Sequence, residues 1–353
     1  MKASKNFLRY IGILRDKVFT GPEIVHFHIN NYCNLRCLYC WFHSPQVKRK
    51  PKPKEIGFED FKRIIDEIEE LGATMIRLSG DGEPTMHSKI KEMIHYIKNK
   101  KLKFSILTNC VFNKDIREIL IDADEIFVNF SAPNKQVYNE IQSIASEIVF
   151  KNVIRNIHYL SIFGKGSVEV QYIINNRNYK YVYEMMKLAS KLGVDSINFK
   201  IMDIVPHNKN LILSREEIED FKTILEHCIR EQRKLKIKSN ISSICTIYSK
   251  PSFIRGGQKR DKYRGKDNVE KCFIGWYFAN INLNGDVTPC CRMNHVIGNI
   301  NKKGFREIWI SEKSHKFRMD GKYFFKMNKG IWNDCSVCEW RKLNHKYLKG
   351  YQV

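Results

Sequence analysis

The pattern of apolar and polar residues along the chain alternates between two periods. Short runs with a period of two, typical of strands, are followed by longer stretches with apolar residues at three- and four-residue steps, typical of amphipathic helices. In the helix predicted over 58–71, for example, five large apolar residues fall on one face. The predicted strands are 24–30, 74–78, 103–107, 125–130, 167–174 and 196–202.

The order of these elements predicts the fold class. Strand and helix alternate six times, which favours parallel strands joined by helical crossovers. Six units are too few for an eight-unit barrel but fit a partial one. We therefore predict an α/β fold, a partial (β/α)6 TIM-like barrel, over residues 24–205. A lead at 1–23 precedes it, and a helix and polar linker at 206–271 follow it.

A different pattern begins near residue 272. Asn284 and Gly285 lie between two short apolar runs, which is the signature of a β-hairpin turn. A helix is predicted around residues 304–311. We therefore predict a small C-terminal module over residues 272–345 that contains a β-hairpin and a helix.

Composition and charge narrow the class of protein. The net charge of +23, from 61 basic and 38 acidic residues, favours an acidic substrate or partner. Nucleic acid is disfavoured because the basic clusters at 48–54 and 255–266 lack interleaved aromatic residues. No apolar run reaches the length of a membrane span, and no signal peptide is recognisable. We expect a cytoplasmic protein without a membrane partner.

The chain has 11 cysteines, an odd count whose clustering favours metal binding over disulfides. Cys33, Cys37 and Cys40 have the spacing C-x3-C-x2-C, on the loop after the first predicted strand. In α/β sheets that edge is where ligands bind. Three local thiolates leave one coordination position open on an iron–sulfur cluster, or belong to a zinc site with a distant ligand.

A second set of cysteines lies in the C-terminal module. Two of its members flank the predicted hairpin and two form a C-x2-C pair near the end of the chain. Spacing alone fits a structural zinc site as well as an iron–sulfur cluster. The set consists of Cys272, Cys290, Cys335 and Cys338.

Two motifs together resemble those of the radical S-adenosylmethionine (radical SAM) enzymes. One is the cysteine trio with Tyr39 as the aromatic residue before Cys40, and the other is the turn at 80–84, similar to the family's G-G-E-P. The resemblance implies a 4Fe–4S cluster held by Cys33, Cys37 and Cys40, whose fourth iron binds S-adenosylmethionine. Reduction of that cluster would release a 5′-deoxyadenosyl radical that abstracts hydrogen from the substrate.

The resemblance also implies residues that bind the cofactor. In the family the glycine-rich turn receives the methionine ammonium group, and Asp81 stands here where relatives have a second glycine. Asn129 and Ser131 follow the fourth strand, where relatives place a polar side chain on the ribose, although either could be a helix N-cap. The implied cofactor-binding residues are Tyr39, Gly80, Asp81, Gly82, Glu83, Asn129 and Ser131.

The C-terminal module resembles the SPASM module in its shortened form, the twitch domain. That resemblance implies an auxiliary 4Fe–4S cluster on the four cysteines of the second set. Cys290 is preferred over Cys291 as the ligand because it follows Gly285 at the usual distance. Cys110 and Cys291 are then the candidate catalytic thiols, as donors of a hydrogen atom to a substrate radical, with packing as the alternative for Cys110.

The type of reaction is inferred from the second cluster, by analogy with enzymes that carry a similar module. Four thiolates would saturate it, which favours an electron-accepting role and an oxidoreductase that dehydrogenates a sugar- or aminocyclitol-like alcohol. Three alternatives stay open: a radical SAM peptide or protein maturase, an epimerase with a cysteine donor, and a non-catalytic metal-binding protein that binds nucleic acid. We expect a small-molecule or peptide substrate and an external electron donor such as flavodoxin or ferredoxin. The candidate bases are Arg155, Lys200, Asp203 and His207.

Overall fold

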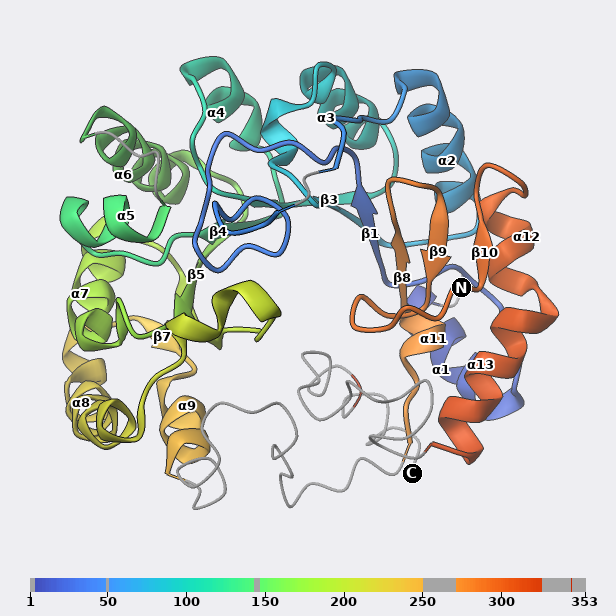
Figure 1. Ribbon diagram of the computed structural model, residues 1–353. Coiled ribbons are helices and arrows are strands. Elements are labelled where there is room, and N and C mark those ends of the chain that lie inside the picture. The colour runs from blue at the N-terminus through green and yellow to red at the C-terminus, as the bar shows by residue number, and fades with distance from the viewer. Residues whose placement is uncertain (1–3, 49–50, 143–146, 250–270, 326–343, 345–353) are drawn as a thin grey trace.

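The strands form one curved, open sheet with helices along its outer side (Figure 1). The computed structural model describes residues 4–48, 51–142, 147–249, 271–325 and Asn344. Within these residues the strand order is β10-β9-β8-β1-β2-β3-β4-β5-β6-β7. All pairs from β1 to β7 are parallel, so the predicted α/β class and partial barrel are confirmed.

The six predicted barrel strands lie within two residues of their predicted positions. A two-residue strand, β7, extends the far edge of the barrel beyond them. The strands are β1 Ile24–His28, β2 Met75–Ser79, β3 Lys103–Thr108, β4 Glu125–Asn129, β5 Ser167–Ile174, β6 Ser196–Ile201, β7 Lys238–Ser239, β8 Phe278–Ile281, β9 Asp286–Thr288 and β10 Gly298–Asn299.

The helices cover the outer side of the sheet and the C-terminal module. They are α1 Lys5–Arg15, α2 Phe58–Glu70, α3 Ile90–Lys98, α4 Lys114–Leu120, α5 Lys135–Gln142, α6 Glu147–Phe163, α7 Val182–Leu192, α8 Arg215–Leu235, α9 Ile241–Tyr248, α11 Ile274–Tyr277, α12 Phe305–Ile310 and α13 Glu312–Tyr323. Short 3-10 turns lie at η1 Pro84–Met86, η2 Tyr179–Tyr181 and η3 Pro206–Leu211. No helix among the described residues has both the length and the apolar character needed to cross a bilayer.

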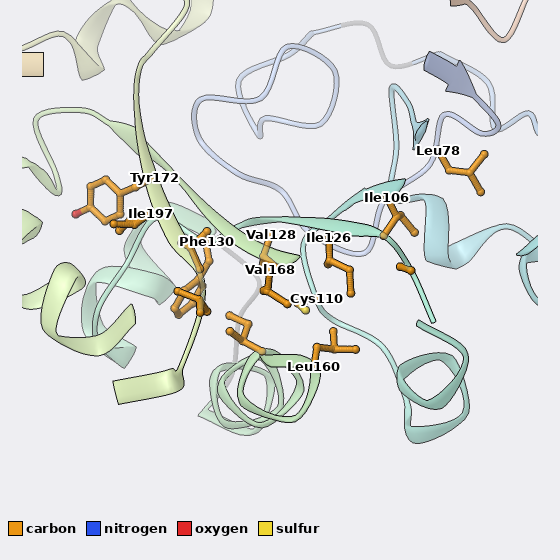
Figure 2. Packing of buried hydrophobic residues seen from close by; sticks show 14 of the residues in the cluster. Leu78, Ile106, Cys110, Ile126, Val128, Phe130, Leu160, Val168, Tyr172 and Ile197 are labelled. Carbon is orange, nitrogen blue, oxygen red and sulfur yellow. The ribbon is translucent and has the colours of Figure 1, made fainter. Parts of the chain in front are cut away.

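The core lies between the strands and the outer helices. On β1, Val25 and Phe27 are fully buried, and the rings of Phe27 and Phe61 stack with centroids 5.5 Å apart. Figure 2 shows the same layer further along the sheet, where strand residues face α6. Because side chains alternate along a strand, His26 and His28 point to the opposite, inner side of the partial barrel.

The C-terminal hairpin is continuous with the barrel sheet. β8 pairs in parallel with β1, from Ile24 opposite Phe278 to Phe27 opposite Ile281. β9 and β10 follow antiparallel, which confirms the predicted hairpin. The indole of Trp309 in α12 donates a hydrogen bond to the carbonyl of Thr20 at 3.2 Å. The module is therefore joined to β1 through backbone pairing as well as side-chain packing.

Candidate functional site

The three thiols of the cysteine loop lie together, partly buried, where the chain leaves β1. Burial raises the pKa of Cys33 to about 12 and also raises the pKa of Cys37 and Cys40. The charges of Cys33 and Cys40 add to the shift at Cys37. Such thiols ionise when metal cations supply the compensating charge. The chemistry of this donor set therefore fits a cluster of iron ions.

Hydrogen-bond donors already point at two of these sulfurs. The backbone N–H of Leu35 donates to Cys33 Sγ at 3.4 Å, and that of His43 donates to Cys40 Sγ at 3.2 Å. Such bonds stabilise the thiolate form. Among the described residues no three His, Cys, Asp or Glu side chains are arranged to hold a single metal ion. In an iron–sulfur cluster the several irons take separate thiolates.

The glycine-rich turn after β2 packs directly on this loop. A Cβ atom at Gly82 would lie 2.2 Å from the carbonyl oxygen of Tyr32, and one at Gly80 would lie 2.9 Å from that of Asn30. The backbone N–H of Glu83 donates to the Tyr32 carbonyl at 2.9 Å. Only glycine allows this approach, so the turn and the cysteine loop form one unit.

Glu83 joins the turn to the end of β3. Its Oε1 accepts hydrogen bonds from the hydroxyls of Thr108 at 2.6 Å and Thr85 at 2.7 Å, and its Oε2 accepts one from the backbone N–H of Asn109 at 2.7 Å. Burial raises its pKa. A carboxylate offers about four acceptor sites, two on each oxygen. Because Oε2 accepts one hydrogen bond here, it can accept a second one from a cationic donor.

Asp81 turns the other way, toward β1. Its Oδ1 lies 3.2 Å from Nδ1 of His28 on the inner side of the barrel. Its backbone carbonyl lies 2.8 Å from Nε2 of His43 in the cysteine loop. The two acidic residues of the turn therefore serve different neighbours, Glu83 on β3 and Asp81 on β1.

Tyr39, Asn129 and Ser131 come together from distant parts of the chain. The hydroxyl of Tyr39 donates to Asn129 Oδ1 at 3.0 Å and lies 3.3 Å from Ser131 Oγ. The alternative role as a helix N-cap belongs instead to Asn134, whose Oδ1 accepts from the N–H of Val137 in α5 at 3.0 Å. Three of the implied cofactor-binding residues thus form one polar cluster.

The auxiliary cysteines are described only in part, because Cys335 and Cys338 lie outside the described residues. Cys290 is buried and Cys291 is exposed. A hydrogen bond with Cys291 and burial raise the pKa of Cys290, and the nearby Cys272 adds to the effect. The side chain of Arg77 belongs to the inner wall, the polar side chains on the inner side of the partial barrel. Cys291 is close enough to Arg77 for the two groups to interact electrostatically. The proximity of Cys290 to Cys272 fits its choice as the ligand.

Cys110, a candidate hydrogen donor, is fully buried in the apolar core. Figure 2 shows it among Ile126, Leu160 and Val168, on the helix side of the sheet. Its backbone is left-handed, with φ 63°, and its carbonyl accepts a hydrogen bond from Asn156 in α6 at 3.0 Å. This position fits packing, the other role that the sequence leaves open, and it does not present the thiol to the inner side.

The four candidate bases lie in different parts of the structure and have different neighbours. Asp203 forms an ion pair of 2.5 Å with Arg292 of the C-terminal module. Nε2 of His207 lies 2.9 Å from the backbone carbonyl of Cys40. Arg155 is exposed on the outer helix α6, away from the inner wall. Lys200 lies on β6 and acts electrostatically on His26.

Polar residues of the inner wall were missed by the sequence reasoning. Arg77 of β2 donates to Glu125 of β4 at 2.6 Å and to Ser105 of β3 at 3.0 Å. His28 faces the same side. Strict alternation of these polar residues with buried apolar ones was the signal that could have identified the wall.

The radical SAM superfamily model matches residues 27–212, more than half of the chain. The chain belongs to the radical SAM superfamily. An iron–sulfur cluster-binding domain, SPASM, matches residues 272–339. This radical SAM chain therefore uses S-adenosylmethionine, a 4Fe–4S cluster and an auxiliary cluster.

Relatives and solved structures cover most of the chain at low identity. An AdoMet-dependent heme synthase of Methanosarcina barkeri is 23% identical over 92% of this chain and 90% of its own length. The antilisterial bacteriocin subtilosin biosynthesis protein AlbA of Bacillus subtilis is 21% identical, over 84% of this chain and 62% of its own. Streptococcus suis SuiB bound to precursor peptide SuiA has a TM-score of 0.64 at 14% identity, over 95% of this chain and 75% of that one. These likenesses support the radical SAM fold.

Proposed function

We propose that this chain is an oxidising radical SAM enzyme that modifies a peptide and passes an electron to its auxiliary cluster. The observation that carries this proposal is the pairing of β8 with β1. The chain leaves β1 into the loop of Cys33–Cys40, and Cys290 follows the β8–β9 hairpin. Cys33, Cys37, Cys40 and Cys290 all lie in segments that continue strands of one sheet, which supports electron flow within one folded unit.

Each group of residues has a role in this proposal. Cys33, Cys37 and Cys40 hold the 4Fe–4S cluster. The glycine-rich turn and the polar side chains around Tyr39 hold S-adenosylmethionine. When bound, the 4Fe–4S cluster and S-adenosylmethionine would supply the radical that removes a hydrogen atom from a substrate carbon, and the auxiliary cluster would be the acceptor of the remaining electron. Glu83, with an acceptor site left on Oε2, orients the methionine ammonium.

The oxidation also releases a proton, which His28 accepts. His28 lies at the end of β1 on the inner side, with Asp81 Oδ1 3.2 Å from its Nδ1. The proximity of this carboxylate to the imidazole supports the choice of His28 as the proton acceptor. Asp203 is engaged with Arg292, so it is less suited to the task.

Two features support a peptide substrate. AlbA is named for the biosynthesis of a bacteriocin, and SuiB has been solved with its precursor peptide. The net charge of +23 suits an acidic peptide segment. The same charge and the high coverage of the heme synthases favour a carboxylate-bearing tetrapyrrole as the second candidate. The sugar or aminocyclitol alcohol expected from the sequence is not supported by these comparisons.

An epimerase remains the main rival reaction. In that reaction Cys291 would return a hydrogen atom, and its exposure and its electrostatic interaction with Arg77 support this role. An external reductant such as flavodoxin or ferredoxin is part of either proposal.

The proposal is tested with anaerobically reconstituted protein and dithionite. Formation of 5′-deoxyadenosine reports cofactor cleavage, and mass spectrometry reports the mass of any short peptide that the neighbouring genes encode. We expect the peptide to lose a pair of hydrogens. Cys290→Ala should stop this loss while cofactor cleavage continues, and Cys37→Ala should abolish both. Cys228→Ala, at a buried position of α8, is the matched control. It should change neither the loss of hydrogens nor the cleavage of the cofactor.

A peptide that loses no hydrogens but gains one deuterium when the reaction is run in deuterated water would establish epimerisation instead. Conversion of a tetrapyrrole with no change to the peptide would establish the second candidate. Either result would overturn the proposed peptide oxidation.

A further inference from the structure

Helix α5 presents two buried polar side chains whose polar atoms lack partners. Tyr138 and Gln142 are four residues apart and so lie on one face of the helix. Tyr138 is fully buried and Gln142 is 1% exposed. Within the described part of the chain, the Tyr138 hydroxyl and both amide atoms of Gln142 have no hydrogen-bond partner. A buried polar atom of this kind calls for a ligand, ion or water that completes it.

Both side chains lie beside the cysteine loop. The end of α5 is fixed to that loop, since the backbone N–H of Leu38 donates to the carbonyl of Ile141 at 2.9 Å. The Gln142 amide lies close enough to the thiol of Cys37 to stabilise its charged form. The Tyr138 hydroxyl interacts electrostatically with Cys37 first, and then with Cys110 and Cys33. The Gln142 amide therefore lies beside the sulfur of Cys37, and the Tyr138 hydroxyl lies near enough to interact with it electrostatically.

Packing fixes the direction of the Tyr138 side chain. The ring of Tyr138 lies 5.6 Å from that of Phe130 and 5.4 Å from that of Phe150, so it is held on two sides. The backbone already provides donors to Cys33 and Cys40, from Leu35 and His43. The α5 side chains complete this arrangement at the third cysteine.

The geometry points to Gln142 and Tyr138 as donors of hydrogen bonds to the cluster sulfurs at Cys37. These hydrogen bonds raise the reduction potential of the 4Fe–4S cluster. Hydrogen bonds to the sulfurs are one of the properties that set such potentials. A donor favours the reduced cluster, because reduction adds negative charge to the sulfurs. The pair would therefore ease loading of the electron that starts catalysis. The inference needs no substrate and is independent of the proposed peptide.

Gln142→Leu tests this in the full, reconstituted chain. A dithionite-poised titration followed by electron paramagnetic resonance measures the potential without any turnover. We expect the variant to be reduced about tenfold less at a fixed poise, equal to about 59 mV for one electron. Gln136→Leu, on the exposed face of the same helix, should leave the potential unchanged.

Cluster-free protein gives an independent reading. An apolar side chain of similar size relieves an unpartnered amide, so thermal denaturation of cluster-free Gln142→Leu should occur at the same or a higher temperature than in the wild type. An unchanged potential together with a less stable cluster-free protein would show a purely structural residue and overturn the inference. If Gln142→Leu does not take up a cluster, Tyr138→Phe decides. A lowered potential in that variant supports the inference, and an unchanged one overturns it.

Discussion

At the scale of single residues, hydrogen bonding to carboxylates assembles the site. Glu83 joins the turn to β3, and Glu55 performs the corresponding task for the segment after the cysteine loop. Its carboxylate accepts hydrogen bonds from the hydroxyl of Tyr32 and, at 3.0 Å, from the backbone N–H of Ser88. The loop that carries the thiols is therefore held in place by carboxylates on either side.

Glu55 predicts a pH-dependent stability. Partial burial by itself raises its pKa, but hydrogen bonds from Ser88 and Tyr32 outweigh it and lower the pKa to about 2. The folded pKa thus lies below the unfolded value of about 4.3. The carboxylate therefore stabilises the protein above about pH 4.3, and this contribution is lost as the pH falls toward 2.

Glu55→Gln should therefore melt below the wild type at pH 6, and the difference should shrink as the pH falls from about 4.3 to 2. Thermal denaturation across that range measures it. Glu59→Gln, an exposed residue at the start of α2, is the control that should show little difference. A deficit in Glu55→Gln that is equally large at every pH would contradict the assigned pKa.

The sequence was sufficient to group the candidate residues that depend on local motifs. Cys33, Cys37 and Cys40 follow from spacing, and their position after β1 is confirmed. The direction of a single side chain was out of reach. Cys110 follows a strand that ends at the site, yet its left-handed φ of 63° directs the thiol into the core. The bond between Tyr39 and Asn129 joins residues 90 positions apart, a contact that no local pattern encodes.

At the scale of elements, periodicity predicted the strands and helices that have one apolar face. It failed for short or polar elements. α13 carries few apolar residues, and β7 and β10 have two residues each, too few to show a period. The parallel pairing of β8 with β1 joins residues about 250 positions apart, so only the folded chain reveals it.

The glycine-rich turn gives a prediction at this scale. Gly82→Ala would place a Cβ atom 2.2 Å from the backbone of Tyr32 and force the turn away from the cysteine loop. We expect S-adenosylmethionine to bind at least tenfold more weakly and the protein to lose about 2 kcal/mol of stability, as overpacked positions do. Equilibrium binding and denaturant unfolding measure the two effects.

Gly57→Ala is the matched control, because the nearest atom to its Cβ would be a side-chain oxygen of Asp60 at 3.8 Å. It should bind the cofactor as the wild type does, with at most a small loss of helix capping. Iron and sulfide content should remain normal in both variants. Normal cofactor binding by Gly82→Ala would mean that the turn does not contact the cofactor.

At the scale of the whole molecule, the C-terminal module completes the barrel. β8 covers the edge of β1, and the guanidinium of Arg318 in α13 donates to the carbonyl of Gly275 at 2.8 Å, which binds the helices of the module to one another. Lys322 reaches α1, where it donates to the carbonyl of Ile13 at 2.6 Å. The N-terminal helix, the barrel and the module therefore share their contacts, and one cooperative unfolding transition is expected.

Removal of residues 272–353 tests this arrangement. The deletion would expose the backbone of β1, a central strand whose unpaired N–H and C=O groups would become an aggregation-prone edge. We expect little soluble monomer by size-exclusion chromatography, whereas deletion of residues 345–353 alone, which keeps the hairpin, should preserve it. A soluble, monomeric and folded barrel from the longer deletion would show that β1 tolerates an open edge. The strand that carries the cysteine loop would then be stable without the module that supplies the second cluster.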